Sequence, residues 1–118
     1  MVTQTVEWTA FDLEVLACIP GDSGVGAKVP ELAEDVFGSP LYAAHDDIPA
    51  VNIQRRMVRA SVARWRRWLA GEIDDPDCLT WLHDKTSPRD YRLGAQLSPR
   101  AYAWVQENWS SLCEQAGV

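Results

Sequence analysis

VNIQRRMVRASVARWRRWLAG, residues 51–71, has an unmistakably helical period. At about 100° per residue, five apolar side chains in this stretch fall within about 40° of one line. These five are Val51, Val58, Val62, Trp65 and Leu69. We therefore expect a long helix over residues 49–70 that buries this stripe against the rest of the domain.

The opposite side of this helix combines arginines with small residues. It carries Asn52, Arg56, Arg59, Ala60, Ala63 and Arg67. No acid occurs between Ile48 and Ala70, whereas a helix that only needs to be soluble more often mixes Glu with Lys or Arg. The pattern predicts a surface that comes close to a partner.

The charge of the chain is unevenly distributed. A net charge of −6 by itself disfavours a nucleic-acid partner, because affinity for phosphates comes largely from Lys and Arg. Residues 1–54 hold nine acids and one lysine, and residues 68–118 hold eight acids and four bases. Residues 55–67 hold six arginines and no acid. The basic segment coincides with the long helix. The distribution of charge along the chain therefore favours a polyanionic partner, although the net charge does not.

Two shorter helices are expected before the long one. Thr9 is a suitable N-cap for a helix over residues 10–19, and the glycine-rich segment Gly21–Lys28 predicts an interhelical loop. A second helix is expected over residues 29–37. Its apolar face consists of Leu32, Ala33, Val36 and Phe37, and its exposed acids are Glu31, Glu34 and Asp35.

A hairpin and a closing helix are expected after the long helix. Residues 79–83 and 90–93 have the pattern of two strands of a hairpin over residues 79–93. Ser98-Pro99 then provides an N-cap followed by proline, which predicts a helix over residues 99–116. Together with an N-terminal tail over residues 1–8, these elements predict one α+β domain over residues 1–118.

Several chemical functions are disfavoured by the sequence. In Gly21–Lys28 the lysine does not directly follow the last glycine and no hydroxyl follows it, unlike in a P-loop. The three cysteines are widely spaced and no metal-ligand pattern occurs, so we expect neither a cofactor, a metal nor an enzyme. No apolar run reaches the roughly 18–20 residues of a membrane span, and the odd cysteine count fits a reducing compartment, so we expect a cytoplasmic protein.

The order helix, helix, long helix, hairpin, helix is that of a winged helix-turn-helix domain, whose third helix enters the DNA major groove while the hairpin, or wing, touches the backbone. The chain resembles the small winged-helix DNA-binding proteins encoded by phages and prophages of high-GC bacteria and, more loosely, bacterial and archaeal winged-helix repressors. The matching pieces are Leu16–Pro20, Val29–Ala33, Arg56–Arg59 with Val62–Trp68, and Asp90–Leu93. The segment Ser39–Asp47 is longer than the turn usual in this family.

This interpretation makes the chain a sequence-specific binder of double-stranded DNA and a transcriptional regulator, such as a repressor, of phage or mobile-element origin. Arginine can bond guanine, asparagine adenine, and an alanine methyl can contact thymine. We expect Asn52, Arg56, Arg59, Ala60 and Ala63 to face the groove. We expect Arg55, Arg66, Arg67, Lys85 and Arg89 to meet phosphates, with a further contact from Lys28.

Two further expectations concern partners. Trp104 lies about 100° from Val105 on the closing helix and is expected outside, where it suits a homodimer contact. The alternative to DNA binding is a winged-helix protein-interaction module or inhibitor whose acidic N-terminal half occupies a basic surface. DNA binding and protein binding differ in whether acids of the chain neutralise the arginines on the exposed side of the long helix. The acids considered are Glu31, Glu34, Asp35, Asp46 and Asp47.

Overall fold

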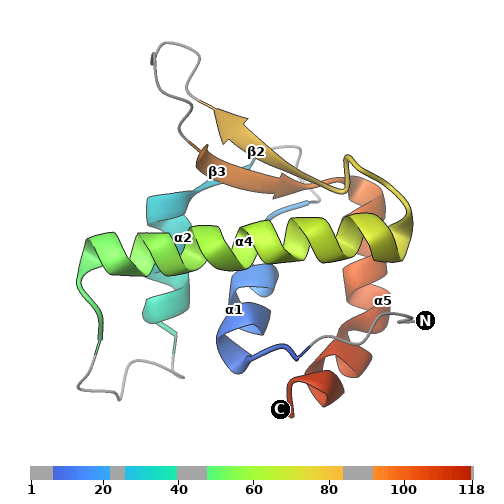
Figure 1. Cartoon of the computed structure of the whole chain (residues 1–118), viewed down its shortest axis with the longest axis horizontal. Helices are drawn as coiled ribbons and strands as arrows, with labels where there is room; N and C mark the ends of the chain where they lie inside the picture. The colour runs from blue at the N-terminus through green and yellow to red at the C-terminus, as the bar shows by residue number, and fades with distance from the viewer. Residues whose placement is uncertain (1–6, 22–25, 40–47, 84–91, 118) are drawn as a thin grey trace.

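The computed structural model describes residues 7–21, 26–39, 48–83 and 92–117 and is mainly helical with a small antiparallel sheet (Figure 1). The α+β class is therefore confirmed. The elements are α1 (Ala10–Cys18), β1 (Ala27–Lys28), α2 (Val29–Phe37), α4 (Val51–Ile73), β2 (Leu79–His83), β3 (Arg92–Leu97) and α5 (Pro99–Gln115). No helix within these described ranges has the length and apolarity needed to cross a bilayer.

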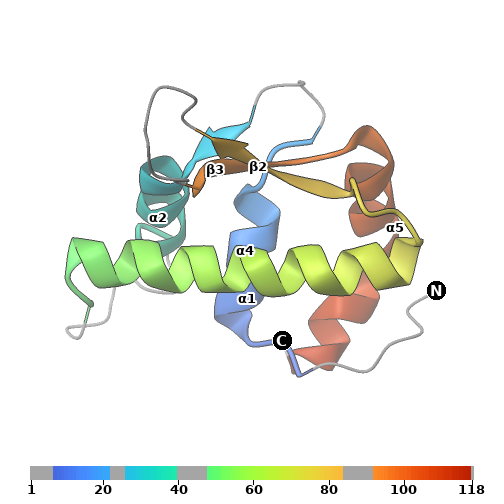
Figure 2. The same ribbon diagram turned by 45° about the horizontal axis from the view of Figure 1, so that its top comes forward.

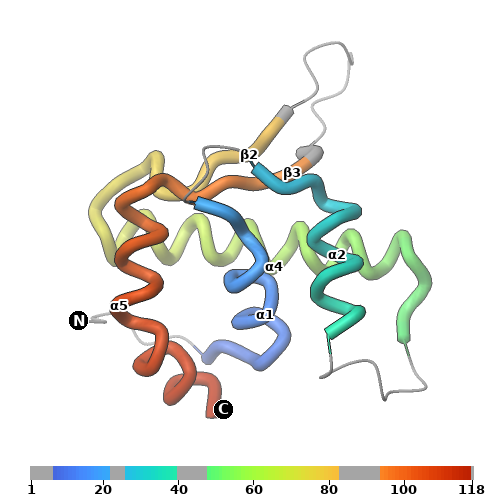
Figure 3. The backbone as a smooth tube through the Cα atoms, turned by 180° about the vertical axis from the view of Figure 1, so that it is seen from behind, coloured from blue at the N-terminus to red at the C-terminus, as the bar shows by residue number. Residues whose placement is uncertain are grey.

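The long helix α4 lies across one side of the three shorter helices. Figures 1 and 2 show α4 in front, with α1 behind its middle and the sheet along one edge. From behind, α1 lies between α2 and α5 (Figure 3). One side of α4 is therefore packed on the domain while the other side faces outward.

The capping residues and apolar faces of the short helices α1 and α2 agree with the predictions from the sequence. The Oγ1 atom of Thr9 accepts a bond from the Asp12 backbone N–H, and the Asp12 carboxylate accepts one from the Thr9 backbone, which completes a capping box. The apolar face of α2 is buried and its three acids are exposed, as expected. Gly38 ends α2.

The sheet corrects two expectations. Ala27 and Lys28, expected in a loop, form a short strand on β3, so the strand order is β1-β3-β2. The second hairpin strand, expected over 90–93, covers Arg92–Leu97 in the described residues and so extends past its expected end at residue 93, while residues 90 and 91 lie outside the described residues. At Gly94, a Cβ would lie 2.2 Å from the carbonyl oxygen of Ala27 in β1. The absence of a side chain at this position thus lets β1 approach β3.

The long helix differs from expectation at both ends. It starts at Val51 and not at residue 49, and Val51 is 56% exposed, so this member of the predicted stripe does not reach the core. The remaining four members of the stripe are buried. The helix continues to Ile73, and Asp74 ends it in the left-handed conformation. The helix thus extends three residues past its expected end at residue 70.

Tryptophans form much of the core between α1, α4 and α5. The rings of Trp8 and Trp65 are stacked with centroids 3.6 Å apart, and Trp68 meets both rings edge-on. Trp104 of α5 meets Trp68 at 5.8 Å, so it is half-buried and not outside as expected. Trp81 of β2 is also half-buried. The tryptophan content is explained mainly by packing.

The closing helix agrees with its prediction except for its last residue. It covers Pro99–Gln115, and the Ser98 side chain accepts a hydrogen bond from the Ala101 backbone N–H. Val105 and Leu112 are both buried, as their spacing of seven residues predicts.

Candidate nucleic-acid interface

The outward face of α4 combines two arginines with two alanines. We use this name for Arg56, Ala60, Ala63 and Arg67, which fall within about 40° of the line opposite the buried stripe. Ala63 is half-buried and the other three are exposed. From Arg56 to Arg67 the face extends about 16 Å along the helix axis. Asn52 is also exposed and extends this face toward the start of α4.

Three further arginines lie on the flank of α4 that adjoins the sheet and α2. The Nε atom of Arg66 donates a hydrogen bond to the carbonyl oxygen of Leu79 in β2 at 3.2 Å. Arg55 and Arg59 are half-buried, which leaves part of each side chain accessible. This flank therefore places positive charge between the outward face and the sheet.

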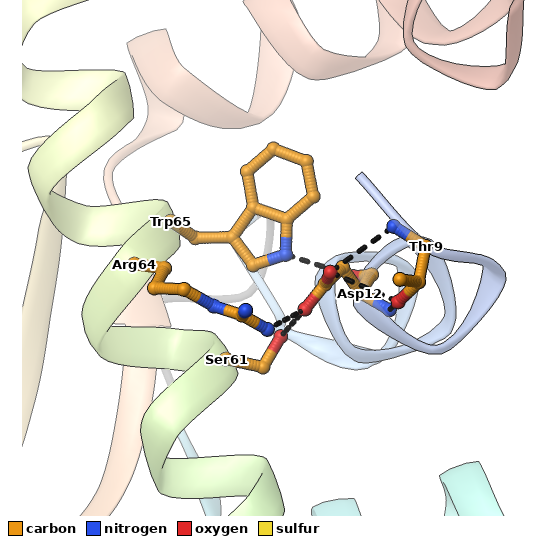
Figure 4. A network of polar contacts seen from close by, with 5 residues as sticks. All are labelled: Thr9, Asp12, Ser61, Arg64 and Trp65. Carbon is orange, nitrogen blue, oxygen red and sulfur yellow. Dashed lines mark hydrogen bonds and ion pairs between the residues drawn. The ribbon is translucent and has the colours of Figure 1, made fainter. Parts of the chain in front are cut away.

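The other flank of α4 adjoins α1, where Asp12 neutralises Arg64. The Asp12 carboxylate is buried and forms an ion pair with Arg64, whose side chain is 52% exposed. The same carboxylate accepts a hydrogen bond from Ser61 at 2.8 Å (Figure 4). The Asp12 carbonyl oxygen accepts one from Nε1 of Trp65, also at 2.8 Å. These contacts fix the rotation of α4 relative to α1.

Among the described residues, Asp12 forms an ion pair with an arginine of α4, and it is not one of the five acids considered from the sequence. Glu31 instead accepts a hydrogen bond from the Lys28 backbone at the start of its own helix, at 3.3 Å. Glu34 and Asp35 are exposed on α2. Asp46 and Asp47 lie outside the described residues. Neutralisation by Asp12 thus removes Arg64, which is not among the predicted DNA-binding residues, from the basic surface.

The remaining predicted contacts lie at the edge of the sheet. Lys28 is exposed at the junction of β1 and α2, consistent with an accessible ammonium group. Lys85 and Arg89, expected at the tip of the wing, lie outside the described residues. The interface can therefore be described for α4 and Lys28 but not for the wing tip.

Two grooves flank the outward face. The α4–α1 groove is lined by Phe11, Met57, Ala60, Ala63, Arg64 and Arg67. The α4–β2 groove is lined by Ala63, Arg66, Arg67, Ala70, Pro76 and Trp81. Ala63 and Arg67 line both grooves, so they form a ridge between them. Ala70, Pro76 and Trp81 are not among the residues predicted from the sequence, because the groove joins segments that are separated along the chain.

Nucleophilic catalysis by cysteine and metal binding receive no support from the described residues. Burial raises the pKa of the Cys18 thiol to about 11, with Asp35 and Glu14 adding to the effect. Burial likewise raises the pKa of Cys78, and the nearby Asp75 carboxylate adds to it. Raised thiol pKa values oppose the thiolate form that nucleophilic catalysis needs. Within the described ranges, no three His, Cys, Asp or Glu side chains are placed to hold a metal ion.

Self-association through α5 stays a prediction. The exposed residues of this helix in the described part are mainly polar, and Trp104 is engaged with Trp68. Trp109 lines a pocket between α1 and α5 together with Leu16 and Tyr102. Part of the Trp104 ring is therefore used in packing within the domain.

Comparison of the chain with protein-family models, with curated proteins and with solved structures finds no match.

Proposed function

We propose that the chain is a winged helix-turn-helix protein that binds double-stranded DNA through the outward face of α4. The observation that carries the proposal is the exposure of Arg56, Arg66 and Arg67 on a helix whose opposite side is buried. An α-helix about 10–12 Å across fits a major groove about 12 Å wide. The order of α1, α2, α4, the β2–β3 pair and α5 supports the winged form of the motif.

The composition of the outward face supports reading of bases in addition to contact with phosphates. Arg56 can donate two hydrogen bonds to guanine, and Ala60 and Ala63 are small enough to bring the helix close to base edges. The proposal includes a role as a transcriptional regulator, such as a repressor of phage or mobile-element origin, because such a role requires sequence-specific DNA binding. A homodimer would place two copies of α4 on adjacent half-sites.

The test is the salt dependence of binding to a fluorescein-labelled duplex of 20 base pairs and mixed sequence. If about four phosphates are neutralised, the logarithm of the association constant falls with a slope near −4 against the logarithm of salt concentration. A single strand of the same sequence serves as the control. Binding that stays flat between about 50 and 200 mM salt would contradict the proposal.

The second candidate function is protein binding through the acidic surface. The observation that favours it is the exposure of Glu31, Glu34 and Asp35 together on α2. The same titration separates the two functions, because a protein-interaction module of this kind gives no salt-dependent binding to the duplex. Charge reversal of Glu34 would then abolish capture of a basic partner, whereas it strengthens DNA binding under the first proposal.

A further inference from the structure

We propose that the α4–β2 groove holds the sugar–phosphate backbone of one DNA strand. This inference rests on the proposed DNA binding and assigns a ligand to a surface that the base-reading face does not include. The groove runs beside the outward face, with which it shares Ala63 and Arg67. When a helix occupies the major groove, the two backbones lie along its flanks, so a groove beside the inserted face is where a strand passes.

The cationic wall of the groove is already positioned for phosphate. Arg66 and Arg67 are adjacent in sequence and both are exposed. The bond from the Arg66 Nε atom to the Leu79 carbonyl oxygen holds that side chain against β2 and leaves its terminal nitrogens as donors. A guanidinium that is held in place loses less conformational freedom when it binds a phosphate.

The rest of the lining suits the sugars between the phosphates. Ala63 and Ala70 are seven residues apart and lie on nearly one line of α4, where their small side chains leave depth for a ligand. Trp81 from β2 and Pro76 from the preceding turn supply apolar surface. Alternating anionic and apolar units are the chemistry of a phosphodiester chain, whereas a free phosphate would use the arginines alone.

The other flank of α4 carries less net charge for the same task. In the α4–α1 groove, Arg64 is compensated by the buried Asp12 carboxylate. The two grooves share Arg67, so Arg66 is the further cation that distinguishes the α4–β2 groove. Charge therefore favours the α4–β2 groove for the more tightly held strand.

The experiment follows Trp81 by 19F NMR in the full chain labelled with 5-fluorotryptophan. Trp81→Phe assigns its signal, and fully buried Trp65 provides an internal reference. A mixed-sequence 20-base-pair duplex, or in a second titration one of its strands alone, is added at low salt while binding is measured separately by anisotropy. We expect the Trp81 signal to shift or broaden with saturation, while the Trp65 signal stays in place.

A variant tests the same groove by filling it. We expect Ala70→Met to weaken duplex binding about tenfold on any sequence. Ala103→Met makes the same change at an exposed position of α5 and should bind as the unaltered chain does. The melting temperature of each variant identifies a loss of folding. If Ala70→Met does not fold, the NMR titration of the unaltered chain decides whether the groove holds the DNA backbone.

Three outcomes overturn the inference in distinguishable ways. If the duplex binds but the Trp81 signal is unchanged and Ala70→Met has no effect, the groove is wrong and the proposed function stands. If the Trp81 signal responds only to a single strand, the commitment to duplex backbone is wrong. If no DNA binds even at low salt, the proposed function fails and this inference fails with it.

Discussion

Asp12 and Arg64 form an ion pair between the first turn of α1 and the middle of α4, although they lie 52 residues apart in the chain. The carboxylate is buried and also accepts bonds from Thr9 and Ser61, so all its partners are held by the fold. The arginine is half exposed at the edge of the proposed interface. One buried acid thus caps α1 and sets which side of α4 faces outward.

Asp12→Ala should lower the free energy of unfolding by about 3 kcal/mol, because it removes a hydrogen-bonded charge and leaves Ser61 and Arg64 without their acceptor. Arg64→Ala should cost about 1 kcal/mol, since Arg64 is half exposed and the carboxylate keeps its other donors. Urea denaturation measures both. The control is Asp35→Ala, which alters an exposed acid of α2. Equal costs for the Asp12 and Asp35 variants would show that the network does not hold α4.

Periodicity predicts the parts of the fold that depend on local patterns. The buried members of the α4 stripe and the apolar face of α2 follow from their helical spacing. The caps at Thr9 and Ser98 follow from residue type and position. Each of these features is encoded within about four to eleven residues, so a single sequence is sufficient to find them.

The features that could not be predicted from the sequence depend on contacts between segments that are far apart in the chain. The strand Ala27–Lys28 exists because Gly94, far along the chain, permits close approach. Asp12 lies among apolar residues of α1, and its role requires Ser61 and Arg64 from another helix. Only the spacing of Thr9 and Asp12, typical of a capping box, signals that this acid has a structural partner.

In the candidate site, too, the features encoded within one helix were predicted and those that join distant segments were not. The arginines and alanines of the outward face were identified from the periodicity of one helix, and all of them are exposed except Ala63, which is half-buried. The groove with Trp81 required knowledge of how β2 lies beside α4. Val51 shows the limit of the periodic argument, because a residue on the correct line is exposed where the helix extends past the core.

Cys18 should react slowly with iodoacetamide at pH 8. With a pKa of about 11, only about one thiol in a thousand is ionised there, and the rate should rise about tenfold per pH unit up to pH 10. Peptide mass spectrometry measures the rate at Cys18 alone. Since the pKa in the folded state is raised, the stability contributed by the neutral thiol is present below pH 9 and decreases above it. A rate that levels off near pH 9 would contradict this environment.

Asp77→Asn should strengthen binding of the mixed-sequence duplex about twofold to threefold at low salt. Asp77 is exposed and adjoins Pro76, which lines the α4–β2 groove, so its charge repels a nearby phosphate. The gain should decrease as salt screens the charge. Glu107→Gln on α5 is the control, because it changes the net charge equally at an exposed position outside the groove. The same gain from both variants would indicate a general charge effect.

Arg56 and Arg67 should contribute to DNA binding in different ways, although both belong to the outward face. Against a duplex chosen by selection from a random library, Arg56→Ala should cost about 1–3 kcal/mol and relax preference at one base pair. Arg67→Ala should weaken selected and shuffled duplexes alike and reduce the magnitude of the salt slope by about one, because Arg67 lines the groove assigned to the backbone. Arg100→Ala removes the same charge from the start of α5 and is the control, with unfolding measured in parallel because Arg100 bonds the Ile73 carbonyl oxygen. If Arg56→Ala and Arg67→Ala have identical effects on both duplexes, the division of α4 into a base-reading part and a backbone-binding part is wrong.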